Sequence, residues 1–348
     1  MRQPLGHLSW GTDPKTNRPW TPAGLQAAMA TNPALARDVP AMLKRAAQTV
    51  GQPLPPLKRI YSEGLLASDP RKIETGKTLK RFDDVAAWGF AARMAPSPLK
   101  EQCQQRITQT LLAWSKTYVP TGNPINENRF LSFFQAADQA LPTTTADQQA
   151  KVRGWIKSFV TTSEHVHLAG LCDINNWRTF NLQIRATGAA VIGDQAAMKR
   201  ASAALDSVLK RTIAANGESF DFRHRDALHY HVYNLSALLN LASLTPQVLT
   251  TDAKRRIEHA VTFMKPYYLG TKKHLEFQHT QVAFDIERRN AGEPAYQVHR
   301  WDPREADDVL QLARAVFPSV RGWTAKAEAD GMGARQELMA TLRWPARP

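Results

Sequence analysis

The sequence has few cysteines and no long apolar run. Only Cys103 and Cys172 occur among its 348 residues; two thiols fit one disulfide but neither prove nor exclude an oxidising compartment. No apolar stretch approaches the roughly 20 residues that span a bilayer, so we expect no membrane span. Residues 1–13, MRQPLGHLSWGTD, lack the apolar stretch of a signal peptide. We therefore expect either a cytosolic protein or the mature form of an exported one.

Acidic residues are outnumbered, with 31 Asp and Glu against 45 Lys and Arg, a formal net charge of +14. Such an excess favours polyanionic partners, namely nucleic acid, an anionic membrane or an acidic polysaccharide, although a solvated basic surface has the same composition. The chain has no Lys/Arg-rich run with interleaved aromatics and no zinc-finger or RNA-recognition signature. We expect no nucleic acid partner.

Alternating strand patterns are also missing, and apolar residues recur instead at helical spacing over segments of about 12–20 residues. Gly, Pro, Asn or Asp breaks separate the segments, and Thr145 or Asp147 is placed to cap one of them. Successive helices with short connections form antiparallel hairpins, and no fixed-period repeat is visible. The pattern predicts an all-α fold, specifically an α/α toroid.

Proline divides the chain unevenly, because nine of its 22 prolines fall within the first 60 residues. We interpret residues 1–60 as a proline-rich arm packed on the body, and residues 61–348 as the α/α-toroid catalytic domain.

Residues 223–235, RHRDALHYHVYNL, concentrate proton carriers and cations. Asp226 is placed as the N-cap of a helix that begins at Ala227. One apolar stripe should face the core: Leu228, Val232, Leu235 and Leu239. His229 and Tyr233 are four residues apart and share a different face. The polar candidates are Arg223, Arg225, His229, Tyr230, His231 and Tyr233.

Two alternatives for this segment are aromatic padding of a helix interface and a metal site. On a helix, His229 and His231 diverge by about 200°, and no HExxH spacing occurs. Further ligands for the metal alternative are Glu164, His165 and His167. We expect no metal and no cofactor, and therefore no effect of chelators on activity.

A second segment, CDINNWRTFNLQIRATGAAVIGD, spans residues 172–194. Asn175 and Asn176 directly precede an apolar helical pattern. One of them can be an N-cap and the other can lie in the turn. That account leaves unexplained a pair of Asn residues followed at once by Trp177 and Arg178.

Together, NNWRTFN and RDALHYHVYNL resemble the active-site signature of alginate lyases built on an α/α toroid. Those enzymes carry an Asn-Asn-His segment and an Arg-Ala-Leu-His-Tyr-His-Asn-Tyr-Ala-Leu segment. The segment KKHLEFQHTQVAFD, followed by RWDP, is similar to the final stretch of such enzymes. The resemblance covers roughly residues 60–320.

The resemblance implies roles for individual residues. Asn176 matches the Asn that neutralises the uronate carboxylate, and Tyr233 matches the Tyr that donates to the leaving oxygen. Trp177 stands where the family has its catalytic His, and Asp226 stands seven residues before the Tyr, where the family has Arg. The catalytic candidates are Tyr233, Asn176, Arg225 and His231. The substrate-binding candidates are Asn175, Trp177, Arg178, Arg223, His229, Tyr230 and His274.

The implied reaction is β-elimination on a uronate polymer. Neutralising the C6 carboxylate eases removal of H5, and a Tyr with a lowered pKa can take that proton and protonate the leaving oxygen. One alternative is a helical glycoside hydrolase, which needs a pair of carboxylates; the nearby acids are Asp173, Glu218, Asp221 and Asp226. Another is an acidic-glycan binder without catalysis.

Trp177 influences which substrate we expect. In β-D-mannuronate and β-D-glucuronate, H5 and the C4 oxygen share one face, so Tyr233 can serve alone. In α-L-guluronate they lie on opposite faces and a second base is needed, which an indole N–H cannot be. We expect action on polymannuronate or a glucuronate polymer and poor action on polyguluronate, unless His229 or His231 is the base. We also expect a monomer that binds an acidic polysaccharide in the periplasm or outside the cell.

Overall fold

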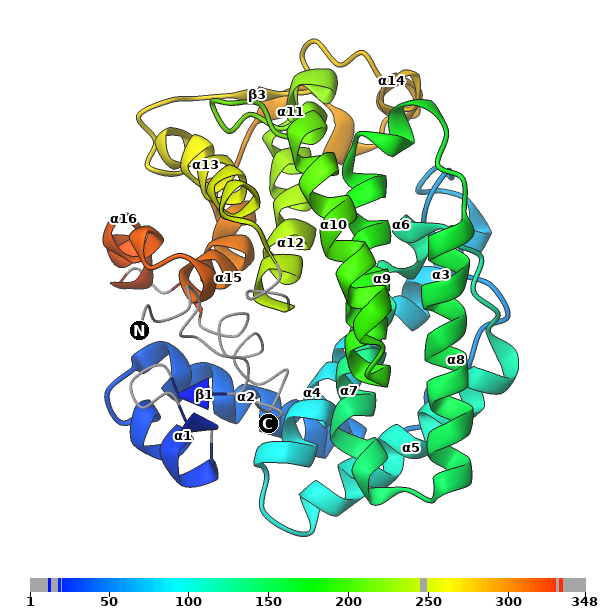
Figure 1. Ribbon diagram of the computed structural model, residues 1–348. Coiled ribbons are helices and arrows are strands. Elements are labelled where there is room, and N and C mark those ends of the chain that lie inside the picture. The colour runs from blue at the N-terminus through cyan, green and yellow to red at the C-terminus, as the bar shows by residue number, and fades with distance from the viewer. Residues whose placement is uncertain (1–11, 14–17, 20, 245–248, 330–331, 334–348) are drawn as a thin grey trace. The chain divides into compact units, whose positions relative to one another are not determined.

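The computed structural model describes residues 12–13, 18–19, 21–244, 249–329 and 332–333. Helices dominate these residues (Figure 1). The strands of the described residues form two short antiparallel ladders, β1 (Thr12–Asp13) with β2 (Arg18–Pro19) and β3 (Leu275–Glu276) with β4 (His299–Arg300). The predicted all-α class is confirmed. No helix within the described ranges is long and apolar enough to cross a membrane.

The chain divides into two compact units. The N-terminal unit holds His7–Val166 and Ile184–Met198, and the C-terminal unit holds His167–Gln183 and Lys199–Glu337; two short terminal pieces outside the described residues complete the division. The helices α9 (Asn176–Ile192) and α10 (Gln195–Thr212) contribute residues to both units. The division into an arm, 1–60, and a body, 61–348, stays a prediction.

The N-terminal unit is built from helices and two 3₁₀ turns. They are α1 (Pro22–Met29), α2 (Pro33–Thr49), α3 (Pro70–Lys80), α4 (Phe82–Met94), α5 (Leu99–Thr117), α6 (Pro124–Glu127), η1 (Asn128–Phe130), α7 (Leu131–Ala140), η2 (Leu141–Thr143) and α8 (Ala146–His165). Thr145 and Gln148 form a capping box at the start of α8, which confirms Thr145 as the cap.

The core of this unit surrounds α4, which packs against α2, α5 and α7. A Cβ at Gly89 would lie 3.3 Å from the Cα of Ala136, so the absence of a side chain lets α4 and α7 approach closely. Aromatic rings fill the space beside them; Phe82, for example, lies 4.6 Å from Phe133 between ring centroids. Such edge and tilted contacts add to the stabilisation from apolar burial.

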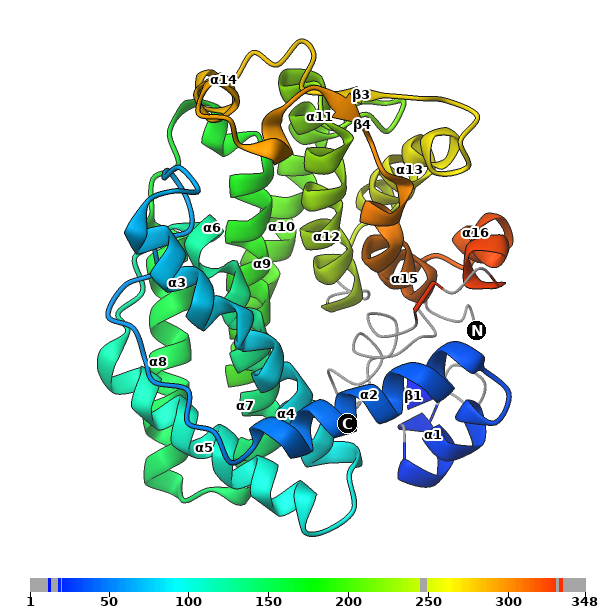
Figure 2. The same ribbon diagram turned by 180° about the vertical axis from the view of Figure 1, so that it is seen from behind.

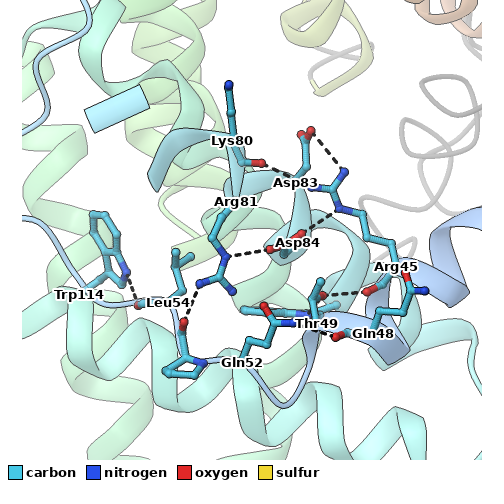
Figure 3. A network of polar contacts seen from close by, with 12 residues as sticks. Arg45, Gln48, Thr49, Gln52, Leu54, Lys80, Arg81, Asp83, Asp84 and Trp114 are labelled. Carbon is cyan, nitrogen blue, oxygen red and sulfur yellow. Dashed lines mark hydrogen bonds and ion pairs between the residues drawn. The ribbon is translucent and has the colours of Figure 1, made fainter. Parts of the chain in front are cut away.

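A network of polar contacts joins the ends of several helices of this unit (Figure 3). The carboxylate of Asp84 accepts from Arg45 Nε at 2.8 Å and from Arg81 Nε at 3.2 Å. Arg81 also donates to the carbonyl of Pro53 at 2.7 Å. One buried acid thus fixes α2 and the segment after it against α4.

A second buried acid of this unit is fully hydrogen-bonded. Glu127 has no exposed surface, and its Oε1 accepts from Tyr118 Oη at 3.0 Å and from the backbone N–H and hydroxyl of Thr121 at 2.5 and 2.9 Å. Its Oε2 accepts from Gly122 N–H at 3.2 Å. The carboxylate therefore holds the turn that follows α5.

The C-terminal unit contains the remaining elements. They are η3 (Gly170–Asp173), α11 (Phe220–Arg225), α12 (Leu228–Leu244), α13 (Thr251–Tyr268), β3, α14 (Ala283–Asn290), η4 (Pro294–Tyr296), β4, η5 (Pro303–Ala306), α15 (Asp307–Val316) and α16 (Ser319–Ala329). The two cysteines, Cys103 in the N-terminal unit and Cys172 in this one, form no disulfide with each other.

Helix α12 is the centre of this unit and contacts α11, α13 and α15 (Figure 2). The predicted apolar stripe is buried, with exposed fractions between 0% and 7% for Leu228, Val232, Leu235 and Leu239. The helical periodicity of the sequence therefore assigned the inward face of α12 correctly.

A glycine turn between α10 and α11 positions this region. Gly217 has φ of +89°, and a Cβ there would lie 2.2 Å from the carbonyl oxygen of His259. Only glycine fits this position. The turn brings Ile213 and Ser219 into an antiparallel bridge, and Ser219 then caps α11 by accepting from Phe222 N–H.

Candidate active site

The two asparagines at the start of α9 have different environments. Asn175 accepts from the backbone N–H of Trp177 at 2.9 Å, so it completes the turn into the helix. Asn176 is 2% exposed, and its Oδ1 is buried without a hydrogen-bond partner among the described residues. A buried acceptor without a donor is costly and rare. The second asparagine is therefore the one that packing and capping do not explain.

Arg178 is held at the edge of this turn. Its guanidinium forms an ion pair with Asp173, whose other oxygen accepts from Arg211 at 2.7 Å. Burial would raise the pKa of Asp173, but the hydrogen bonds from Arg211 and Arg178 lower it below its ordinary value. Asp173 is thus ionised and links Arg178 of α9 to Arg211 of α10. The positive charge of Arg178 is therefore paired with the carboxylate of Asp173.

The prediction that Asp226 caps the signature helix is wrong. Asp226 ends α11 in a left-handed conformation with φ of +51°, and its Oδ2 accepts from the backbone N–H of His279 at 2.8 Å. Helix α12 is capped from β3 instead, because Glu276 accepts from the N–H groups of Leu228 and His229 at 2.8 and 3.0 Å. Burial raises the pKa of Glu276 to about 7, although both amides favour its ionised form.

Arg225 lies in a buried cluster beneath this helix start. Its guanidinium forms an ion pair with Asp285 at 2.5 Å and lies over the ring of Tyr230, 3.9 Å from the centroid. Burial would lower the pKa of Arg225, but the nearby Tyr230, Asp285 and Asp221 raise it above its ordinary value. The cation is therefore permanent, and a carboxylate and an aromatic face hold it.

Tyr230 connects this cluster to a second arginine. Its hydroxyl lies 3.1 Å from that of Tyr296, which accepts from Arg288 at 2.6 Å. Burial raises the pKa of Tyr296, so this phenol stays protonated, and the two hydroxyls share one hydrogen bond in which either can be the donor. The cluster thus holds two guanidinium groups, those of Arg225 and Arg288, near the carboxyl group of Asp285.

A buried carboxyl group lies close to both motifs. Asp221 of α11 is 1% exposed, and neither carboxylate oxygen has a hydrogen-bond partner among the described residues. Burial raises the pKa of Asp221 to about 7, against the charge of Arg225 and the nearby backbone amide of Asn176. Burial therefore favours the protonated form of this carboxyl group.

Tyr233 brings the two signature segments together. Its ring packs on Phe180 of α9 with centroids 4.5 Å apart, and Phe180 lies one turn after Asn176. Tyr233 is partly exposed and packs at the edge of a cluster of buried aromatics that includes Tyr230 and Phe277. Asp221 of α11 lies near the backbone amide of Asn176, which is a second link between the two signature regions.

His231 is a core residue, which corrects its assignment as a catalytic group. It has no exposed surface, and its Nδ1 and Nε2 contact Ser219 Oγ and the carbonyl of Ala260, each at 2.9 Å. Burial lowers its pKa to about 4, so the ring is neutral near pH 7. Both ring nitrogens are occupied, and no sugar can reach them.

The other predicted histidines differ in access. The side chain of His229 is 53% exposed, and its Nδ1 lies 2.9 Å from Glu305 Oε2. His274 is mostly buried and contacts the carbonyl of Asp226 through Nε2 at 3.1 Å. Arg223 is exposed and lies 3.8 Å from Glu218. Of these residues, His229 has an oriented ring that faces outward.

The residues of the metal alternative have other partners. Glu164 forms an ion pair with Arg185 at 3.1 Å, and His165 Nδ1 contacts the carbonyl of Thr161 in its own helix. Over the described ranges, no group of three or more His, Cys, Asp or Glu residues is arranged to hold a metal ion. The insensitivity to chelators stays a prediction.

Several site residues were not identified from the sequence. Glu276 and Asp285 lie in the stretch KKHLEFQHTQVAFD, which was singled out only as a likeness. Tyr296, Arg288 and Glu305 have no local signal at all. Glu276, Asp285 and Glu305 lie 47 to 76 residues from their partners on α11 and α12, so only the folded chain reveals these contacts.

Comparisons with known proteins identify the family and the fold. Residues 24–274 match the family model described as alginate lyase. The fold is similar to the crystal structure of an alginate lyase from Bacteroides ovatus, with a TM-score of 0.58, 14% sequence identity, and coverage of 91% of this chain and 96% of that one. This likeness supports the predicted toroid class. A search of curated proteins finds no match. Because the family match spans most of the chain and includes both signature segments, the protein belongs to the alginate lyase family and is a polysaccharide lyase.

Proposed function

We propose that the protein cleaves a uronate-containing polysaccharide by β-elimination, with Tyr233 as both proton acceptor and proton donor. The observation that carries this proposal is the ring contact between Tyr233 and Phe180, 4.5 Å between centroids, which joins the two signature segments. A partly exposed phenol beside the start of α9 fits a group that reaches a bound sugar. The basic net charge of +14 suits an anionic polymer.

In this mechanism the C6 carboxylate of the sugar must be neutralised, because charge builds on it as H5 leaves. Asn176 is the proposed amide donor at this position. The guanidinium groups of Arg225 and Arg288 add electrostatic stabilisation in surroundings with little water. Protonation of Asp221 keeps a second negative charge away from the substrate carboxylate.

The proton and electron movements are simple. Tyr233, as phenolate, takes H5; the electrons of the C5–H bond form the C4=C5 double bond, and the C4–O bond breaks. The new phenol then protonates the leaving oxygen. One residue suffices where H5 and the C4 oxygen share a face, so polymannuronate and glucuronate polymers are the proposed substrates. We also propose a periplasmic or extracellular location and a monomeric state.

The hydrolase alternative needs two carboxylates that reach the sugar. Asp173 is occupied by two arginines, Asp221 is buried, and Asp226 accepts from His279. The family also contradicts it, since the chain is a lyase. The acids nearest the signature segments are therefore better explained as structural or electrostatic groups.

The test is a panel of polyuronates, followed through the ultraviolet absorbance of the conjugated double bond that only elimination creates. Tyr233→Phe should lower turnover by at least about two orders of magnitude while the protein stays folded. Tyr61→Phe is the matched control, because Tyr61 lies in the N-terminal unit and should tolerate the change. Wild-type turnover in Tyr233→Phe would remove that residue from the mechanism.

A further inference from the structure

His229 and Glu305 form a pair whose geometry has a chemical consequence. Glu305, in η5, lies 2.9 Å from Nδ1 of His229, in the first turn of α12. Because a carboxylate only accepts, the neutral imidazole carries its proton on Nδ1. The lone pair is then on Nε2, for which no partner is found among the described residues, and the side chain is 53% exposed.

The other histidine contacts within the described ranges are different. His231 uses both nitrogens in the core, and His274 contacts a carbonyl, with carboxylates no closer than 3.6 Å. His165 and His299 contact backbone carbonyls through Nδ1. His229 thus combines access, a carboxylate at hydrogen-bond distance and a position in the signature segment.

His229 lies next to Tyr233 on α12. Residues four apart on a helix have Cβ atoms about 5–6 Å apart. Tyr230 packs edge-on against both rings, with its centroid 5.3 Å from that of His229 and 6.4 Å from that of Tyr233. Each ring also has a contact that the other lacks, Glu305 of η5 for His229 and Phe180 of α9 for Tyr233.

We propose that His229, oriented by Glu305, is a second catalytic base that lets the enzyme cleave units whose H5 and C4 oxygen lie on opposite faces, as in α-L-guluronate. This inference rests on the proposed function. Nε2 takes H5, the electrons of that C–H bond form C4=C5, and the C4–O bond breaks. Tyr233 protonates the leaving oxygen, and the imidazolium then returns its proton to solvent.

This inference revises the expectation that Trp177 makes polyguluronate a poor substrate. The sequence left His229 and His231 as alternative bases, and the burial of His231 removes one of them. Glu305 is a positioning residue in this account: it fixes the tautomer and the direction of the ring without touching the sugar. Tyr233 alone still acts on mannuronate units.

The experiment compares initial rates on polyguluronate and polymannuronate. His229→Gln should lower kcat on polyguluronate by about 100-fold or more and change polymannuronate turnover little. Glu305→Gln should lower kcat on polyguluronate by at least about tenfold, with a smaller effect on KM. Added imidazole should restore polyguluronate cleavage to His229→Ala, which a purely structural role does not allow.

The matched controls are His165→Gln and Glu258→Gln, which lie outside both signature segments; His165 contacts its own helix and Glu258 accepts from Ser319. Both should cleave the two polymers at wild-type rates. An equal loss on both polymers in His229→Gln, or a wild type that cleaves polymannuronate but not polyguluronate, overturns the base role and leaves the proposed function standing. A wild type that forms no unsaturated product from any polyuronate overturns both.

Discussion

Glu127 in the N-terminal unit and Asp221 in the C-terminal unit are both buried carboxyl groups, with exposed fractions of 0% and 1%. Glu127 accepts four hydrogen bonds from Tyr118, Thr121 and Gly122. Asp221 accepts none among the described residues. Burial of a polar group is tolerable when its partners are present and costly when they are absent. The first acid therefore stabilises a turn, whereas the second is retained at a cost in stability.

The surroundings of the two acids differ in the same way. Aromatic rings pack beside Glu127, for instance Tyr118 on Phe130 at 4.6 Å between centroids. Around Asp221 lie Arg225, Asp285 and Asn176, and the Oδ1 of Asn176 is also without a donor. Groups left unsatisfied in a folded protein gather where function requires them. The contrast is therefore between a carboxyl group whose partners hold a turn and one that the proposed mechanism uses electrostatically.

The largest effect should come from removing the satisfied acid. Glu127→Ala leaves a buried phenol and two backbone N–H groups without an acceptor, so we expect a loss of about 3–5 kcal/mol in stability. Chemical denaturation followed by circular dichroism measures it. A loss below about 1 kcal/mol would mean that water replaces the carboxylate, and the contrast between the two acids would disappear.

Removing Asp221, which accepts no hydrogen bond among the described residues, should instead increase the stability of the protein. The folded pKa of Asp221 is about 7 and its ordinary value is 3.8, so its contribution to stability is present below pH 4 and is lost as pH rises to 7. Asp221→Asn, which cannot ionise beside Arg225 and Asp285, should be more stable than wild type by on the order of 1 kcal/mol or more at pH 8. Melting temperatures from pH 4 to 8 test this. An offset that is the same at every pH would contradict it.

His231 should show the reverse pH dependence. Burial lowers its folded pKa from 6.5 to about 4, so its contribution is present above pH 6.5 and is lost as pH falls through 4. His231→Gln should cost about 1–3 kcal/mol near pH 7.5 through the lost contacts to Ser219 and Ala260. The difference from wild type should shrink toward pH 4 in the same melting series. A difference that grows on acidification would mean that the native ring is charged.

The smallest effect belongs to a surface pair. Lys151 and Asp147 form an ion pair at 2.7 Å in α8, but their side chains are 57% and 71% exposed. Solvent and salt screen such pairs, so Asp147→Ala should cost about 0.5 kcal/mol or less. This variant is the baseline for Glu127→Ala under the same denaturation protocol. A larger loss would point to the capping turn of α8, where Asp147 also lies.

The sequence was sufficient for features that depend on neighbouring residues. Helical spacing identified the buried stripe of α12, and the sequence narrowed the cap of α8 to Thr145 or Asp147, of which the structure shows Thr145. The family resemblance also came from two short segments. Periodicity and capping depend on residues within one or two helical turns, so the sequence alone contains what is needed to recognise them.

Features that depend on residues far apart in the sequence could not be predicted from local patterns. Asp226 has the right residue type for a cap, yet the carboxylate that caps α12 comes from Glu276, 47 and 48 residues from its two partners. His231 has the right type for a base, but contacts with Ser219 and Ala260 bury it. Residue type was informative in both cases, and only tertiary packing determined the role.

The cap of α12 has a consequence for how the enzyme matures. Glu276 lies in β3, whose register with β4 pairs Glu276 with His299. During synthesis the signature helix emerges well before these strands, so its first two N–H groups have no protein acceptor until residue 276 arrives. Contacts over such separations form late in folding because the intervening loop must first close. A nascent or truncated chain that ends before β3 therefore has both signature segments but lacks the carboxylate that caps the helix carrying the second of them.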